Sequence, residues 1–318
     1  MSVFTELTRS DIETLLDQYT LGRYSDHQGI SAGTENTNYF IDTNLSRFVL
    51  TIFEKLHADE LPFFLSLGEH LHDDNCAVPQ PYRTAEGELL TVLKDKPAVM
   101  FERVIGQHHQ ASPKHAQTLA RALANIHTST AKFNGQRIHS HGATWIHQQA
   151  VHLAPGFDSA DQALLTEALQ SIDTLPRNLP RGVIHADLFH DNALFDGDDL
   201  AGIIDWYFAG IDHYALDIAV CLIDWCLNID GQLDWQQSLD FVQAYHQQRP
   251  LQRDELEAMP ALVVQAATRF WLSRALAFDE HADPSQITIK DPTAMKVLAH
   301  QALQEGAKFG EMLLHELD

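Results

Sequence analysis

Hydrophobic and polar positions change their period once along this chain. Up to about residue 104, short runs rich in Val, Ile, Phe and Tyr are separated by turn residues, a pattern that predicts strands. The expected strands are "NYFIDT" (38–43), "RFVLTIFE" (47–54), "LLTVL" (89–93) and "AVMFERV" (98–104). One helix interrupts them at about 59–73, with Asp59 as its cap and Pro62 in its first turn.

Beyond residue 104 the apolar positions recur at the helical period. Leu119, Leu123 and Ile126 share one stripe of a helix that Ser112 caps and Pro113 begins. Further helices are expected at about 159–172, 213–229, 235–247, 252–278 and 292–316. The exception is residues 182–208, where "NALF" and "AGIID" are joined through Asp196-Gly197, a hairpin signal.

This order predicts an α+β protein with two lobes. A small, mainly antiparallel β lobe is expected over residues 1–103, and a larger helical lobe that carries the hairpin over 104–318. A connector lies near 100–106. The chain has 318 residues, enough for a sizeable core in two such parts.

Charge narrows the classes of partner. The chain has 21 Lys and Arg against 44 Asp and Glu, a net charge of -23, whereas a nucleic-acid binder needs a basic face. The three cysteines form no disulfide pattern, and the N-terminus "MSVFTELTRSDIETLL" lacks a signal peptide's apolar core. We therefore expect a cytoplasmic protein with no nucleic-acid or membrane partner. We expect it to be a monomer or a homodimer.

The stretch "HADLFHDN", residues 185–192, carries the densest polar chemistry. A zinc site is one interpretation, but the sequence has no HExxH and no paired CxxC. An ordinary polar turn before a hairpin is another. The third follows the spacing: His185-x-Asp187, then Asn192, then Asp205 at the end of the next strand is the order of kinase catalytic loops.

Phosphoryl transfer explains these residue types. Asp187 would orient the attacking hydroxyl and take its proton, while Asn192 and Asp205 would supply hard oxygen ligands for Mg²⁺. The β lobe should then hold a nucleotide-phosphate loop, for which "GISAGTENTNYF" (29–40) is the candidate. Gly33 would let the backbone approach the phosphates of ATP, and the amides of Thr34 and Asn36 would donate to them. Asn36 and Asn38 could instead only stabilise the turn.

Taken together, these segments resemble the aminoglycoside-phosphotransferase-like kinases, small-molecule relatives of protein kinases, over nearly the whole chain. The family's H-G-D-x-x-x-x-N loop and I-D-[WFP]-like strand read here as "HADLFHDN" and "GIIDWYFAG". The resemblance implies the protein-kinase-like two-lobe fold, with Asp187 as catalytic aspartate and Asn192 and Asp205 as metal ligands. Ala186 replaces the usual glycine, which threatens no side-chain role.

The same resemblance supplies supporting roles. His185 belongs to the loop motif, and Asp217 in "YALDIAVCL" would brace the loop, or only serve as a carboxylate at a helix N-terminus. The connector "AVMFERVIG" resembles an adenine-binding hinge, with backbone groups near Met100 and Glu102 on the adenine edge.

More narrowly, "SAGTENTNYFIDT", "FVLTIFEKL", "ELPFFLSLGEHL" and "RFWLSR" resemble bacterial homoserine kinases of this fold. That resemblance implies ATP-dependent phosphorylation of the L-homoserine side-chain hydroxyl, a step of threonine biosynthesis. Tyr207, Arg269 and Arg274 are the candidate substrate residues, with at most one of the arginines expected to face the substrate. Choline, ethanolamine, methylthioribose and aminoglycosides remain alternative acceptors.

One departure bears on catalysis. Where the family has a phosphate-binding lysine or arginine on a strand, "FVLTIFEK" has Thr51. Lys55 shares its parity but lies about 13 Å further along an extended strand, so it cannot simply substitute. Glu60 is a weak counterpart of the lysine's usual glutamate partner. A non-catalytic nucleotide-binding protein and a metallohydrolase therefore stay open as other classes.

Overall fold

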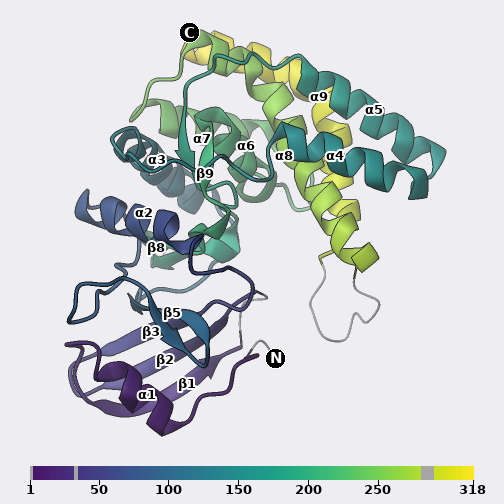
Figure 1. Cartoon of the computed structure of the whole chain (residues 1–318). Helices are drawn as coiled ribbons and strands as arrows, with labels where there is room; N and C mark the ends of the chain where they lie inside the picture. Colours follow the sequence, from purple (N-terminus) through teal and green to yellow (C-terminus); the bar gives the residue numbers. More distant parts are fainter. Residues whose placement is uncertain (1–2, 32–34, 281–289) are drawn as a thin grey trace. The chain divides into compact units, whose positions relative to one another are not determined.

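The computed structural model of the chain describes residues 3–31, 35–280 and 290–318. It divides into two compact units, the first ending at Ile105 and the second beginning at Gly106. The first is an antiparallel sheet with two helices and the second is mostly helical, so the predicted α+β class is confirmed (Figure 1).

The first unit is built on a five-stranded antiparallel sheet of order β1-β2-β3-β5-β4. Its strands are β1 (Tyr24–Ile30), β2 (Thr37–Thr43), β3 (Arg47–Ile52), β4 (Thr91–Leu93) and β5 (Lys96–Glu102). Its helices are α1 (Arg9–Leu16) and α2 (Leu61–Asp73). In β3 and β5, Leu50, Ile52 and Met100 point into one core, which Ile12 and Leu15 of α1 also enter.

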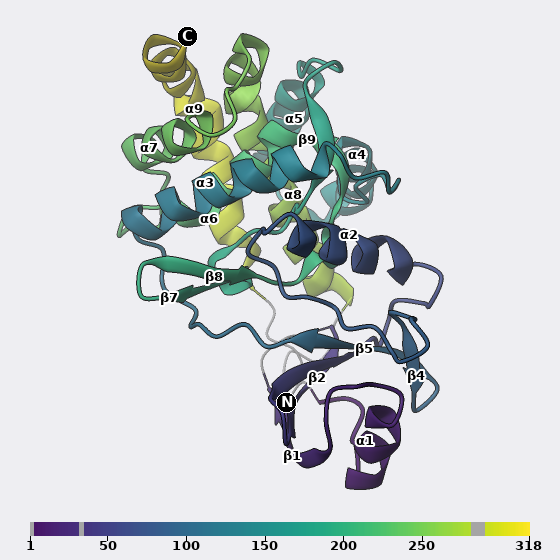
Figure 2. The ribbon, with the colours of Figure 1, turned by 90° about the vertical axis from the view of Figure 1, so that its left-hand side faces the viewer.

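The second unit places two short strand pairs among its helices (Figure 2). β6 (Arg181–Ile184) pairs with β9 (Gly210–His213), and β7 (Ala193–Asp196) forms a hairpin with β8 (Asp199–Ile203). The hairpin turns at Gly197, whose φ of +61° suits glycine. Its helices are α3 (Pro113–Thr130), α4 (Ala143–Leu153), α5 (Ser159–Asp173), α6 (Tyr214–Trp225), α7 (Trp235–His246), α8 (Arg253–Glu280) and α9 (Pro292–Leu317).

Besides the paired strands β6 and β9, three described helices and strands were missed by the sequence analysis. α1 begins with a capping box between Thr8 and Asp11, a local signal present in "TRSD". β1 lacks the alternating burial of a half-buried strand because it lies at the edge of the sheet. α4 begins at Gly142 without a side-chain cap, so its start carries little local signal.

Two expected boundaries were wrong. Asp59 does not cap α2, because the N-cap is Glu60 and no side-chain cap bond forms there. The helix expected to reach residue 229 ends at Trp225, after which Leu227 and Leu233 form an isolated bridge. Ser112 caps α3 and is followed by Pro113, as predicted, and Asp291 caps α9 in the same way before Pro292.

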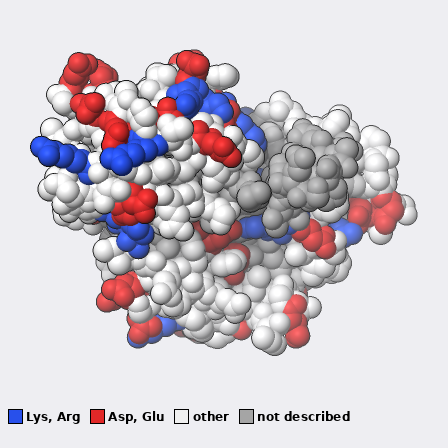
Figure 3. Space-filling view, turned by 90° about the horizontal axis from the view of Figure 1, so that it is seen from below, with Lys and Arg blue, Asp and Glu red and all other residues white. Residues whose placement is uncertain are grey.

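Charged side chains are dispersed over the face of the molecule that Figure 3 draws. Figure 3 shows acidic and basic groups interspersed on the face that it draws, with uncharged surface between them. Among the described helices, none combines the length and the apolar character that crossing a membrane requires.

Candidate active site

The predicted catalytic loop connects two strands of the second unit. β6 ends at Ile184, immediately before His185, and β7 begins at Ala193, immediately after Asn192. Pairing of β6 with β9 and of β7 with β8 fixes the backbone at both ends. The intervening residues 185–192 are therefore anchored although they form only one short 3-10 turn.

Asn192 contacts Asp187 from within the loop. Its Nδ2 donates to the Asp187 carbonyl at 2.7 Å and to carboxylate Oδ2 at 3.2 Å. Because a carbonyl oxygen can only accept, the first bond decides which end of the amide is nitrogen. The amide oxygen of Asn192 takes no part in these two bonds and is the end suited to a cation.

The hairpin register brings Asp205 next to Asn192. Ala193 lies opposite Ile203, and the amide of Ile204 donates to the Asn192 carbonyl at 3.0 Å. Asp205 follows directly, with a φ of +63° in the left-handed region and an exposed side chain. The two predicted metal ligands therefore lie at the same end of the hairpin.

The chemistry of this pair fits a hard cation that shares its coordination with phosphate. Mg²⁺ usually binds through one or two carboxylates together with substrate phosphates and water, rather than in an all-protein cage. The amide oxygen of Asn192 and the carboxylate of Asp205 are donors of that kind. Among the described residues, no group of three or more His, Cys, Asp or Glu is arranged to hold a metal.

Asp217 on α6 holds the backbone where the loop begins. Its two carboxylate oxygens accept from the amide of His185 at 2.8 Å and from that of Ala186 at 2.7 Å. His127 Nε2 donates to the same carboxylate at 3.0 Å, and the hydroxyl of Tyr245 contacts the other ring nitrogen at 2.7 Å. Burial alone would raise the pKa of Asp217, but the hydrogen bonds from His127 and the loop lower it. An ionised carboxylate therefore ties two consecutive loop amides to α6.

The His185 ring links the loop to the second strand of the hairpin. Its Nε2 donates to the Ile204 carbonyl at 3.0 Å, and its Nδ1 accepts from the amide of Asp187 at 3.2 Å. These partners require the neutral ring, and complete burial lowers the pKa of His185 accordingly. The side chain therefore acts as a fixed connector.

Ala186 adopts a backbone conformation that favours glycine. Its φ is +67°, and its side chain is fully buried. An L-residue in the left-handed region costs roughly 1–2 kcal/mol, which glycine avoids. A glycine at this position would avoid that cost, and this chain adopts the conformation with alanine.

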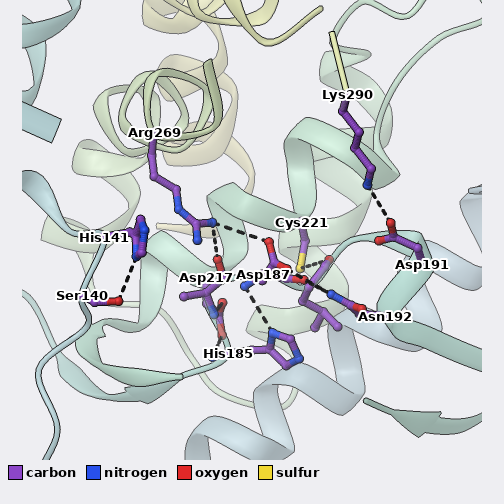
Figure 4. Close-up of polar contacts among 12 residues, drawn as sticks. Ser140, His141, His185, Asp187, Asp191, Asn192, Asp217, Cys221, Arg269 and Lys290 are labelled. Atoms are coloured by element: carbon purple, nitrogen blue, oxygen red, sulfur yellow. Dashed lines mark hydrogen bonds and ion pairs between the residues drawn. The ribbon is translucent and has the colours of Figure 1, made fainter. Parts of the chain in front are cut away.

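Arg269 on α8 reaches the loop from the side opposite Asn192 (Figure 4). Its Nη1 donates to the Ala186 carbonyl at 2.7 Å and lies 3.7 Å from Oδ1 of Asp187. The guanidinium also covers the ring of Phe270, 4.0 Å from the centroid. The predicted substrate residue thus contacts the catalytic loop itself, which the sequence did not indicate.

The surroundings of Asp187 favour its neutral form. Burial raises the pKa of Asp187 to about 6, with Asp191 adding to the rise while Arg269 and Asn192 oppose it. A carboxylate with this pKa is still mostly ionised at neutral pH, and it accepts a proton more readily than an exposed aspartate. Such a raised pKa is typical of carboxylates that act as bases.

The other two predicted substrate residues have different surroundings. Arg274 donates through Nη1 to the carbonyl of Asp291 at 3.2 Å, and burial lowers its pKa. Tyr207 lies in the 3-10 turn Trp206–Phe208, and burial, with a contribution from Asp205, raises its pKa. Arg269 therefore hydrogen-bonds the loop directly, whereas Arg274 bonds Asp291 and interacts with Asp187 and Asp191 through its charge.

Two ion pairs at this loop were missed by the sequence analysis. Asp191 pairs with Lys290 at 2.6 Å, and His190 Nδ1 donates to Asp224 at 2.8 Å. The partners lie 99 and 34 residues apart, so no local pattern connects them. Both pairs restrain the 3-10 turn His190–Asn192.

The expected nucleotide-phosphate loop is only partly visible. Gly33 and Thr34 lie outside the described residues. Asn36 is half-buried in a bend immediately before β2. The assignment of these three residues to ATP binding stays a prediction.

The structure shows the backbone partners of Met100 and Glu102, the residues expected at the adenine-binding hinge. The Met100 carbonyl accepts from the amide of Tyr82 at 2.8 Å, and the Glu102 amide donates to the Gln80 carbonyl at 2.8 Å. These backbone groups are thus occupied by the segment alongside β5. The sequence of β5 alone did not show this pairing with residues 80–82, and the assignment of Met100 and Glu102 to ATP binding stays a prediction.

The position of the missing lysine is occupied by a neutral pair. The Thr51 hydroxyl donates to Oδ1 of Asn38 at 2.8 Å, across the register of β2 and β3. Lys55 is exposed and pairs with Glu35 at 3.4 Å. Glu60 accepts from the amide of His57 at 3.1 Å, in the turn before α2.

Lys96 does not fill the gap either. Residues Ala98 and Met100 of its strand enter the core beside α1, and Lys96 shares their parity. It pairs with Glu54, which also accepts from the hydroxyls of Thr5 at 2.7 Å and Thr37 at 2.6 Å. This cluster fastens the N-terminal segment to the sheet, on the face opposite Thr51.

Comparison with known proteins adds a family and full-length relatives. Residues 26–262 match the sequence profile of a protein family described as "Phosphotransferase enzyme family". The homoserine kinase of Pseudomonas aeruginosa is 40% identical over 301 residues, which cover 93% of this chain and 95% of that protein. The homoserine kinase of Methylobacillus flagellatus is 41% identical over 278 residues, 86% of each.

Solved structures share the fold at low sequence identity. An aminoglycoside phosphotransferase from Alicyclobacillus acidocaldarius has a TM-score of 0.70 at 16% identity and covers 98% of both chains. The amicoumacin kinase hAmiN, solved in complex with AMP-PNP and Ca²⁺, has a TM-score of 0.69 at 15% identity and covers 96% of this chain and 94% of its own.

Proposed function

Because the chain belongs to the phosphotransferase enzyme family and, at 40% identity over 93% of its length, to the homoserine kinases, we propose that it transfers the γ-phosphate of ATP to the side-chain hydroxyl of L-homoserine. The product is O-phospho-L-homoserine. The observation that carries the choice of substrate is the similarity to homoserine kinases along nearly the whole chain.

The loop geometry supports the transfer step. Asp187 orients the homoserine hydroxyl and accepts its proton as the oxygen attacks the γ-phosphorus. Asn192, which donates to Asp187 Oδ2 at 3.2 Å, holds that carboxylate in place. Asp217 and Arg269 keep the preceding backbone rigid through Ala186, so Asp187 needs little reorganisation when substrate binds.

In this proposal Asn192 and Asp205 hold Mg²⁺ together with phosphate oxygens of ATP. The cation neutralises charge on the phosphates when bound. Residues Gly33, Thr34 and Asn36 of the β1–β2 connection supply further phosphate contacts. The neutral Asn38–Thr51 pair replaces the strand lysine found elsewhere in the family.

An acceptor screen tests the proposal. Purified protein is incubated with ATP, Mg²⁺ and one acceptor at a time, with ADP release as the rate and mass spectrometry for the product. The acceptors are L-homoserine, choline, ethanolamine, methylthioribose and an aminoglycoside. We expect L-homoserine to give the highest kcat/KM and a product with one added phosphate, lost when Mg²⁺ is chelated. A higher kcat/KM for another acceptor would reject the substrate assignment.

A further inference from the structure

A small cavity lies beside the catalytic loop, within the second unit. Its lining is formed by His139, His141, Ala186, Leu216, Val220, Gln265, Ala266 and Arg269. Its volume is about 10 Å³, room for the centre of one group the size of a water molecule. Ala186 immediately precedes Asp187, so the cavity adjoins the residue proposed as the base.

Two lining residues each contain a buried nitrogen to which no described residue hydrogen-bonds. Arg269 is 4% exposed, and its Nε has no hydrogen-bond partner among the described residues. His139 is 6% exposed, and its Nε2 also has no hydrogen-bond partner among the residues that the structure describes. Buried donors and acceptors are almost always paired, so two such atoms around one cavity indicate a missing polar group.

The two nitrogens have opposite hydrogen-bonding character. Arg269 Nε–H can only donate. His139 contacts Asp212 through Nδ1 at 3.0 Å, and because the carboxylate accepts, Nδ1 is the donor. In the neutral ring this leaves Nε2 as an acceptor. A group that brings both an anionic oxygen and an N–H satisfies both atoms.

Charges around the cavity favour the same group. Arg269 is a buried cation. The carboxylate of Asp187 lies 3.7 Å from its Nη1, so this ion pair leaves Nε to face another group. Burial, with contributions from Arg269 and His139, lowers the pKa of His141 to about 3. His141 is therefore neutral at physiological pH and does not repel an ammonium group.

On this basis we propose that the cavity beside Arg269 and His139 receives one carboxylate oxygen from the α-amino-acid end of the acceptor, to which Arg269 Nε donates, and that the adjacent ammonium donates to His139 Nε2 at the cavity wall. The assignment rests on the proposed function and adds a recognition site for the zwitterionic end to it. The cavity takes one carboxylate oxygen, while the rest of the acceptor extends toward Asp187.

The reach of the acceptor agrees with this placement. Four-carbon L-homoserine spans about 5 Å from its hydroxyl oxygen to its carboxyl carbon, given bond lengths near 1.5 Å. Asp187 and Arg269 are in contact at 3.7 Å. One such molecule can therefore bond the Asp187 carboxylate at one end and Arg269 Nε at the other. Arg269 then links recognition of the acceptor to the loop that carries the base.

Comparing two acceptors in the wild type and in variants shows whether Arg269 recognises the acceptor carboxylate or only supports the catalytic loop. The acceptors are L-homoserine and 3-aminopropan-1-ol, which has the same chain and amine but no carboxylate. The variants are Arg269→Gln and, as a matched loss of charge on the same helix, Arg274→Gln. For the wild type we expect kcat/KM to be about 10- to 100-fold higher for L-homoserine, the contribution of one charge-assisted hydrogen bond.

In Arg269→Gln this preference should fall to within about threefold of unity, while Arg274→Gln should keep the wild-type ratio. L-2-Aminobutanoate, which lacks the hydroxyl, should inhibit the wild type competitively and lose at least tenfold in affinity in Arg269→Gln. A role confined to the loop would lower kcat for both acceptors equally and leave that inhibition constant unchanged. This outcome would overturn the proposal and leave the cavity as the place of a water molecule.

Two further readouts keep the test decisive. If Arg269→Gln fails to fold by circular dichroism, Ala266→Val narrows the cavity from another wall and should reduce the same preference. An unchanged preference in a folded Ala266→Val would also reject the site. Absence of L-homoserine turnover in the wild type would instead reject the proposed function. Failure of the proposed function is therefore seen in the wild type, and failure of the proposed site is seen in the variants.

Discussion

Arg269 donates from Nη1 to the Ala186 carbonyl at 2.7 Å. The same nitrogen lies 3.7 Å from Oδ1 of the Asp187 carboxylate. One buried cation therefore fixes the backbone before Asp187 and also favours the ionised form of its side chain. Burial works in the other direction, and the balance leaves the pKa of Asp187 raised to about 6.

This balance predicts the acid side of the pH–rate profile. Only ionised Asp187 can accept the hydroxyl proton, so kcat/KM for L-homoserine should decline below about pH 6. Arg269 lowers the pKa of Asp187, so Arg269→Gln should shift this decline to higher pH. Initial rates between about pH 5 and 9 measure both effects. Full activity at pH 4.5, or an unshifted profile in the variant, would contradict the assignment.

The same pKa predicts a stability cost at neutral pH. The folded pKa of Asp187 lies above the unfolded value, so the folded state binds the proton more tightly and loses stability as pH rises from about 4 to about 6. Two pKa units correspond to roughly 3 kcal/mol. Asp187→Asn should therefore raise the free energy of unfolding by about 1–3 kcal/mol at pH 7.5. Urea unfolding measures this increase in the free energy of unfolding, which should shrink toward pH 4. An Asp187→Asn protein less stable than the wild type at pH 7.5 would contradict the raised pKa.

The left-handed Ala186 gives a test of the loop backbone. Ala186→Gly should stabilise the fold by about 0.5 kcal/mol, because relief of the roughly 1–2 kcal/mol cost exceeds glycine's entropy penalty. Ala193→Gly is the matched control: that residue is also fully buried, but its φ is −123°. The control should lose about 1 kcal/mol. Equal losses in both variants would show that Ala186 carries no backbone strain.

The sequence predicted the parts of the site that depend on local spacing. Asp187, Asn192 and Asp205 were found because a loop and the adjoining hairpin bring them together within a short segment. The residues that hold the loop in place are distant from it, or from one another, in the sequence. His127 lies 90 residues from its partner Asp217, and Arg269 lies 83 residues from its partner Ala186. No periodicity reports such contacts, since they depend on how helices pack. The sequence therefore could not show that Arg269 contacts the loop, although it indicated Arg269 as a candidate substrate residue.

The first unit shows the same limit. The strand positions of Met100 and Glu102 were predicted correctly, but their backbone groups turned out to bond residues 80–82. Long-range pairing decides which backbone groups remain available, and the sequence of one strand does not report its neighbour.

The Asn38–Thr51 pair predicts a tolerant strand position. Thr51→Val removes one neutral hydrogen bond, which contributes about 0.5–1.5 kcal/mol net, so turnover and ATP affinity should change by at most about tenfold. Lys55→Ala should have little effect, because its pairing with Glu35 is exposed. ATP titration and steady-state rates measure both variants. A thousandfold loss in folded Lys55→Ala would identify Lys55 as the phosphate-binding cation.

The most direct measurement is the fate of L-homoserine in the presence of ATP and Mg²⁺, compared between the wild type and Asp187→Asn. The account predicts that the wild type releases ADP and phosphorylates the side-chain oxygen, seen as a phosphate ester by ³¹P NMR. In Asp187→Asn, kcat should fall at least about 10²-fold, the scale of a positioned general base, while ATP affinity is largely kept. Absence of the ester with the wild type, or near-normal turnover by a folded Asp187→Asn, would contradict the account.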